Sequence, residues 1–94
     1  MDYRKFLSYR QKSDSLINAI KSKQKDKRLI DENFVNRFIQ TNPEMFQVYR
    51  LLGDWYKATN DNATAVKYWE TALTKEIPHL REKEYLEKQI KKVK

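Results

Sequence analysis

The chain contains no cysteine, one glycine and two prolines in 94 residues. Without cysteine it can form neither a disulfide framework nor a thiolate metal site, and it has no cysteine nucleophile. Loops that cradle phosphate groups need several glycines, so a Walker loop and a dinucleotide-binding fingerprint are also excluded. All-β folds depend on tight turns that use glycine and asparagine, and such a fold is not expected here.

Long apolar runs are also missing. No stretch approaches the ~18 consecutive apolar residues that a membrane-spanning helix needs, so no membrane span is expected. The N-terminus, MDYRKFLSYRQKSD, lacks the apolar run of a signal peptide. The expected location is the cytoplasm if Met1 is the true start, and it is open if the chain is a fragment. The short length predicts one domain over residues 1–94.

Charge is abundant and unevenly distributed. Charged residues make up 35% of the chain, and the formal net charge is +7. Residues 1–28 carry nine Lys or Arg and three acids, residues 29–78 carry five and seven, and residues 79–94 carry six and three. The excess positive charge therefore lies at the two ends. Its densest part, called the basic patch below, consists of Lys21, Lys23, Lys25, Lys27 and Arg28.

Apolar residues recur every three or four positions along most of the chain, which is the spacing of a helix face. This periodicity predicts an all-α fold with about five helices in antiparallel hairpins. A break with a new N-cap at Ser13-Asp14-Ser15 is the alternative to one long first helix. The five helices are expected at about residues 2–25, 28–41, 43–59, 62–75 and 78–94.

Two prolines and one turn mark the expected boundaries. Asn42 is expected to cap the third helix with Pro43 at its first position, because proline fits the first turn of a helix. The sequence Asn60-Asp61-Asn62 predicts a turn that supplies the next N-cap. Pro78 is expected to open the fifth helix.

Residues 43–78 carry a pattern that resembles the tetratricopeptide repeat (TPR) family. Its residues are Tyr49, Leu52-Gly53, Tyr56, Ala65, Trp69, Ala72 and the closing Pro78, one position later than usual. The resemblance implies two antiparallel helices that approach closely at small residues, with aromatic rings beside them. Glycine inside a helix costs ~1 kcal/mol relative to alanine, so Gly53 is expected at a close helix contact.

The segments on either side of this hairpin match the repeat less well. A shift by the ~34-residue period of the family places Ala19 under Gly53, but it places Ser15 and Ser22 where aromatic residues belong. Residues 1–42 are therefore two flanking helices, and a degenerate repeat there is an open alternative. Residues 79–94 are expected to form a C-terminal capping helix.

The resemblance also implies a binding groove lined by the first helix of each hairpin. Relatives that clamp the terminal carboxylate of a peptide use lysine and asparagine on this helix, whereas Asp54 stands here at the asparagine position. Its negative charge would repel a carboxylate, so a different kind of peptide is expected. The candidate partner-binding groove consists of Gln47, Arg50, Asp54 and Lys57.

Aromatic residues mostly fall on the apolar helix faces and are expected in the core. Three that lie off these faces, Tyr3, Trp55 and Tyr68, are candidates for exposed contacts with a partner.

Nothing in the sequence points to catalysis. His79 is the only histidine, and no paired carboxylates or metal-ligand spacing accompany it, so we expect no catalytic residues, no metal and no cofactor. The main hypothesis is a non-catalytic protein-interaction or scaffold module that binds a protein or peptide. An extension of this hypothesis is that the chain is the C-terminal appendage of a larger bacterial protein. The alternative is a small basic nucleic-acid-binding protein that uses the basic patch. That alternative is less favoured, because the patch has no interleaved aromatic residues and no known motif.

Overall fold

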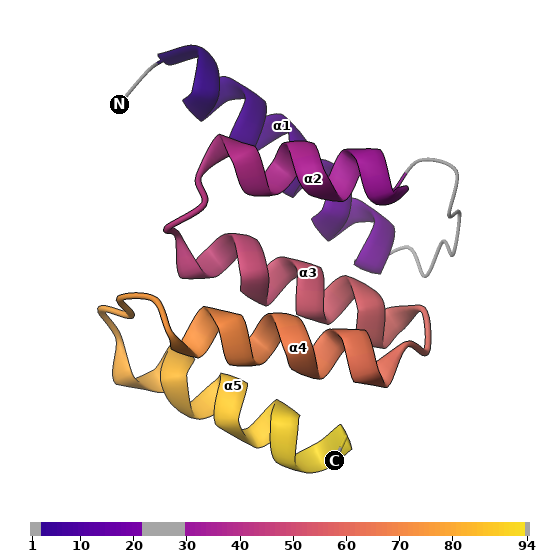
Figure 1. Cartoon of the computed structure of the whole chain (residues 1–94), viewed down its shortest axis with the longest axis vertical. Coiled ribbons are helices and arrows are strands. Elements are labelled where there is room, and N and C mark those ends of the chain that lie inside the picture. The colour runs from indigo at the N-terminus through magenta and orange to yellow at the C-terminus, as the bar shows by residue number, and fades with distance from the viewer. Residues whose placement is uncertain (1–2, 22–29, 94) are drawn as a thin grey trace.

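The computed structural model describes residues 3–21 and 30–93. Within these ranges the chain forms helices and no strands (Figure 1). The helices are α1 (Tyr3–Lys21), α2 (Glu32–Thr41), α3 (Phe46–Ala58), α4 (Asn62–Leu73) and α5 (Leu80–Val93). The predicted all-α fold of five helices in antiparallel hairpins is therefore confirmed.

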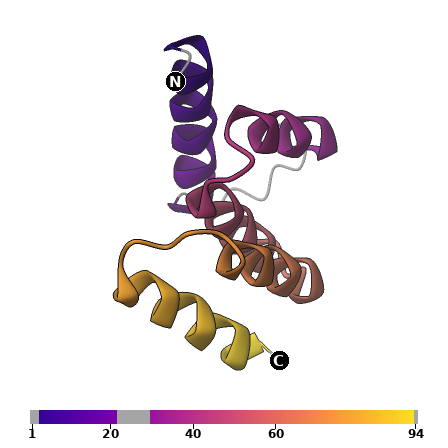
Figure 2. The same cartoon turned by 60° about the vertical axis from the view of Figure 1, so that its left-hand side comes forward.

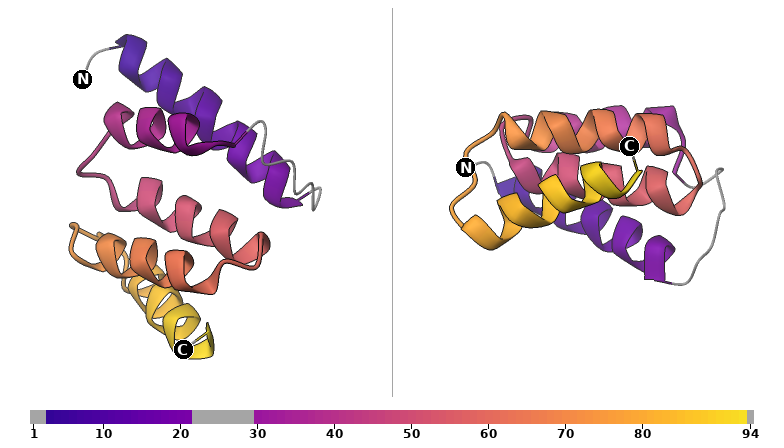
Figure 3. Two further views of the ribbon diagram at one scale, coloured as in Figure 1. Left: turned by 45° about the vertical axis from the view of Figure 1, so that its right-hand side comes forward. Right: turned by 90° about the horizontal axis from the view of Figure 1, so that it is seen from below.

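The helices stack in sequence order and measure 36 × 31 × 19 Å together. The most extensive contact joins α3 and α4, while α1 packs on both α2 and α3 and α5 packs on α4. Seen from below, α2 and α4 lie along one side of the molecule and α1 and α5 along the other, with α3 between them (Figure 3). Figure 2 shows α1 and α5 at opposite ends of the stack. The side of α3 that faces α1 and α5 is therefore less enclosed than the side that faces α4.

The first helix runs through Ser13 without a break, so the prediction of one long helix is confirmed over the described residues. The Ser13 hydroxyl donates to the Arg10 carbonyl at 3.2 Å, which satisfies this buried polar group inside the helix. The second helix begins at Glu32, four residues later than predicted. Asp31 is its N-cap, and its carboxylate accepts a hydrogen bond from the Phe34 amide at 2.8 Å.

The predicted start of the third helix is wrong. Asn42 is the C-cap of α2 and its amide donates to the Ile39 carbonyl at 3.2 Å, so it is not the N-cap of the next helix. Pro43 lies in a turn, and α3 begins at Phe46. The Tyr49 hydroxyl donates to the Pro43 carbonyl and holds this turn against the helix. The start of α3 therefore lies three residues after Pro43, and a local hydrogen bond joins the intervening turn to the helix.

The fourth helix begins at a side-chain N-cap, and the fifth begins at a backbone hydrogen bond. Asp61 caps α4 as predicted, and its carboxylate accepts from the Thr64 amide at 3.2 Å. The preceding Asn60 has φ 66°, a left-handed conformation that asparagine tolerates. Pro78 does not open α5, which starts at Leu80. The His79 carbonyl accepts from the Glu82 amide at 3.1 Å and begins the helical hydrogen bonding instead.

One continuous core joins the five helices. Each helix contributes at least one side chain with no exposed surface: Leu16, Phe38, Leu52, Trp69 and Leu86, in chain order. Leu86 belongs to this core, so the fifth helix buries one face against the helices before it. Trp55 is also buried, with 3% of its surface exposed, so its predicted role as an exposed contact is wrong. The Tyr3 side chain lies outside the described part of the structure.

Candidate functional site

A cavity of about 420 Å³ lies between α1 and α3. It is lined by Tyr9, Ser13, Ile17 and Ile20 from α1 and by Gln47, Arg50, Leu51 and Asp54 from α3. Isoleucine and leucine side chains make its walls apolar, and the amide, guanidinium and carboxylate of α3 add polar groups on one side. We call this cavity the α1–α3 groove.

Three of the four predicted groove residues meet here. Gln47, Arg50 and Asp54 follow one another along α3 at helical spacing and all line the α1–α3 groove. Lys57 is the exception, since its ammonium group donates to the Gln89 side-chain oxygen of α5 at 2.8 Å. The charge of Lys57 is therefore directed toward α5.

Asp54 connects three helices. Its Oδ1 atom accepts one hydrogen bond from the Trp69 indole of α4 at 3.2 Å and another from the Tyr85 hydroxyl of α5 at 2.9 Å. Burial raises the pKa of the Asp54 carboxyl, while the Tyr85 hydrogen bond and the nearby Arg50 charge oppose that rise. The pKa of Tyr85 is raised to about 12 by burial and by the neighbouring Asp54 charge. Tyr85 therefore remains a hydrogen-bond donor at neutral pH.

Arg50 is held in place by α3 and α5. Its Nη1 atom lies 3.5 Å from Glu82 Oε1, and its Nε atom lies 3.9 Å from Asp54 Oδ2. The guanidinium carbon lies 5.2 Å from the centre of the Tyr85 ring, within the range of a cation–π contact. The Nε atom is buried and has no hydrogen-bond partner among the described residues. Arg50 lies between the carboxylates of Asp54 and Glu82, so this part of the groove has no net positive charge.

The sequence-based prediction missed the parts of the site that other helices supply. Tyr9, Ile17 and Ile20 of α1 line the groove, and Glu82 and Tyr85 of α5 hold its Arg50. Ser13 was a signal in the sequence for a cavity beside α1, because a small serine among the larger apolar residues of a helix face leaves space next to them. No local signal identifies Tyr85, which reaches Asp54 from 31 positions away.

The basic patch falls almost wholly outside the described residues. Lys21 is the last residue of α1, whereas Lys23, Lys25, Lys27 and Arg28 belong to the segment 22–29. Its role in binding therefore stays a prediction. His79 is exposed, and over residues 3–21 and 30–93 no group of three potential ligand side chains could hold a metal ion.

Comparison of the chain with protein-family models, with curated proteins and with solved structures gives no match. None of the described helices is both long and apolar enough to cross a membrane. The functional argument therefore depends on the geometry of the α1–α3 groove and on the residues that line it.

Proposed function

We propose that the chain is a non-catalytic protein-interaction module of the TPR type that binds a segment of another protein in the α1–α3 groove. The observation that carries this proposal is the convergence of two helices on one cavity of about 420 Å³ with apolar walls and a few polar groups. Binding sites in proteins have this character, since apolar walls supply affinity and a few polar groups fix orientation.

The contact between α3 and α4 supports the repeat assignment. Ala65 and Ala72 have no exposed surface, and a side-chain carbon added to Gly53 would overlap the indole ring of Trp69. Small residues at a close helix contact, filled from the side by an aromatic ring, are what the TPR resemblance implies for residues 43–78. The same resemblance would make α1 and α3 the groove-lining helices of successive hairpins.

The chemistry of the groove favours a partner segment with an apolar side chain. Ile17, Ile20 and Leu51 would surround such a side chain. The Gln47 amide can both donate to and accept from the partner's backbone. Asp54 and Glu82 already balance the Arg50 charge, so a terminal carboxylate is not the expected anchor.

A random peptide library displayed on phage, selected against the intact chain, tests this function. The enriched peptides should share an apolar anchor, and their affinity can be measured by fluorescence anisotropy. Leu51→Glu should weaken binding at least ~10-fold, because it places a charge in the apolar part of the groove. Lys67→Glu, at an exposed position of α4, is the matched control and should bind normally. Peptides that bind both variants equally would contradict the proposed site, provided that circular dichroism shows both variants folded.

Nucleic-acid binding remains a second candidate because of one observation, the five basic residues within positions 21–28. It involves a different part of the chain from the α1–α3 groove. The two candidates can therefore be tested with separate sets of variants.

A further inference from the structure

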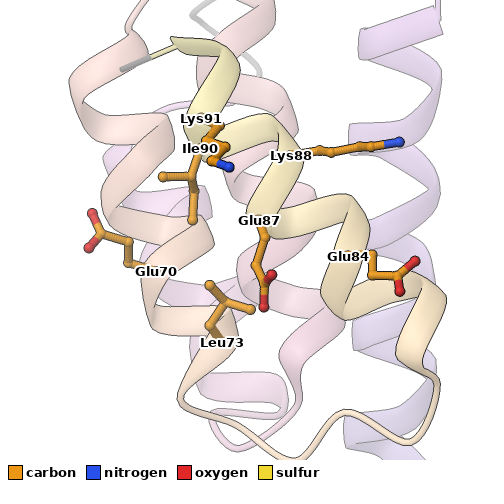
Figure 4. A pocket seen from close by; sticks show the side chains of 7 residues that line it. All are labelled: Glu70, Leu73, Glu84, Glu87, Lys88, Ile90 and Lys91. Atoms are coloured by element: carbon orange, nitrogen blue, oxygen red, sulfur yellow. The ribbon is translucent and has the colours of Figure 1, made fainter.

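A second concave surface lies between α4 and α5, at the C-terminal end of the stack (Figure 4). Its volume is about 540 Å³. The residues that line it are Glu70, Leu73, Glu84, Glu87, Lys88, Ile90 and Lys91. Leu73 and Ile90 form an apolar floor, and charged side chains surround it. An apolar centre with a charged rim is the composition of a protein interface. We call this surface the α4–α5 face.

The charges that α5 contributes to this face have a definite order. Glu84 and Glu87 come first along the helix, and Lys88 and Lys91 follow. A helix places residues with this spacing on one side. Figure 4 shows Glu84 and Lys88 extending to one side of α5 and Glu87 extending toward Leu73. None of the four forms an ion pair with another residue in the described part of the chain.

This order is complementary to itself when the helix direction is reversed. We propose that two copies of the chain form a dimer in which their α5 helices pack antiparallel about a two-fold axis between Glu87 and Lys88. Glu84 would then face Lys91 of the other copy. Measured along one α5 helix, with a rise of 1.5 Å per residue, Glu84 and Lys91 each lie ~5 Å from the two-fold axis, on opposite sides of it. Glu87 would face Lys88 in the same way. Two-fold symmetry repeats each contact, so four pairs of opposite charges form.

The distribution of charge favours a second copy as the occupant of this face. Residues 79–94 carry six basic and three acidic residues, so the α5 helices of two copies repel each other unless their acids and lysines are brought opposite one another. The α4–α5 face carries three acids and two lysines, which sum to −1. Of the two ways of pairing the α5 helices at this face, only the antiparallel arrangement matches acids with lysines. A parallel arrangement would place like charges opposite each other, which costs binding energy.

The dimer is independent of the proposed peptide site. Glu82 and Tyr85 lie on the side of α5 that contacts Arg50 of α3, whereas other residues of α5 line the α4–α5 face. Peptide binding and dimer formation can therefore succeed or fail separately.

Sedimentation equilibrium of the intact chain, from low micromolar to several hundred micromolar, tests the proposal. We expect a monomer–dimer equilibrium. Two double variants test the order of the charges. Glu84→Lys/Glu87→Lys has lysine at all four of positions 84, 87, 88 and 91, and Lys88→Glu/Lys91→Glu has glutamate at all four. Each variant alone should dimerise at least ~10-fold more weakly than the wild-type chain. An equimolar mixture should form a heterodimer, since every facing pair is then opposite in charge.

If the mixture of the two double variants dimerises, their weak dimerisation alone reflects loss of the interface and not loss of folding, because an unfolded variant would not form a heterodimer. Arg37→Glu, on the exposed side of α2, is the control and should dimerise like the wild-type chain. The proposal is overturned if the wild-type chain is monomeric throughout this range. It is also overturned if the double variants dimerise as well as the wild-type chain, or if their mixture stays monomeric.

Discussion

The indole ring of Trp69 lies directly against the backbone of Gly53, in the space that any side chain at residue 53 would occupy. The same indole donates its hydrogen to Asp54, the next residue along α3. Trp69 has no exposed surface, so α3 and α4 cannot move apart without exposing it. This contact explains why the chain places its single glycine in the middle of a helix.

Gly53→Leu should strongly destabilise the chain, because the new side chain would overlap the Trp69 ring. Overpacking typically costs ~1–3 kcal/mol, which should lower the melting temperature measured by circular dichroism. Ala63→Leu is the matched control, since Ala63 is exposed on α4 and a larger side chain there meets solvent. A Gly53→Leu chain that melts at or above the wild-type temperature would contradict the close contact.

Asp54 should make stability depend on pH. Burial raises the pKa of its carboxyl, so the folded chain binds a proton at this site more readily than the unfolded chain does. Lowering the pH from the raised folded value toward the ordinary value of 3.8 should therefore stabilise the wild-type fold relative to Asp54→Asn, which cannot titrate. Urea unfolding of both chains at neutral pH and near pH 4 measures this difference. If the difference in the free energy of unfolding between the wild-type and Asp54→Asn chains is the same at both pH values, the pKa of Asp54 is not shifted by folding.

Removal of residues 79–94 should expose apolar surface that α5 covers. Leu86 belongs to the core, and Tyr85 and Gln89 also bond to residues of α3. We expect the shortened chain to aggregate or to bind a hydrophobic dye, and light scattering and dye fluorescence detect these outcomes. Leu86→Ala in the full chain should cost ~2–5 kcal/mol in unfolding experiments, because it leaves a cavity in the core. A soluble 1–78 fragment of equal stability would show that α5 is not a structural cap.

Replacement of Lys21, Lys23, Lys25 and Lys27 by glutamine tests the nucleic-acid alternative. We expect folding to be preserved and the wild-type chain to bind labelled strands only at micromolar or weaker affinity in physiological salt, the level of non-specific contact. Phosphate contacts release counterions, so log affinity should fall by ~0.9 per tenfold rise in salt for each phosphate contacted. Nanomolar, sequence-preferring binding that this replacement abolishes would favour the nucleic-acid function over protein interaction.

Much of the candidate groove could be predicted from one helix alone. Gln47, Arg50 and Asp54 share a side of α3 because of helical periodicity, and that periodicity was visible in the sequence. Lys57 has the same spacing but donates to Gln89 instead. Ile17 and Ile20 could be assigned to a helix face, but the sequence did not show which other helix that face would meet.

Helix number and the approximate helix positions followed from the sequence by itself, because helical hydrogen bonds and apolar spacing are local properties. The close contact at Gly53 was also predictable, since a glycine inside a helix needs a packing reason. The tertiary structure decided the burial of Trp55 and the meeting of Tyr85 with Asp54. These features depend on how side-chain ridges of one helix pack into the grooves of another, and that packing joins residues far apart in the chain.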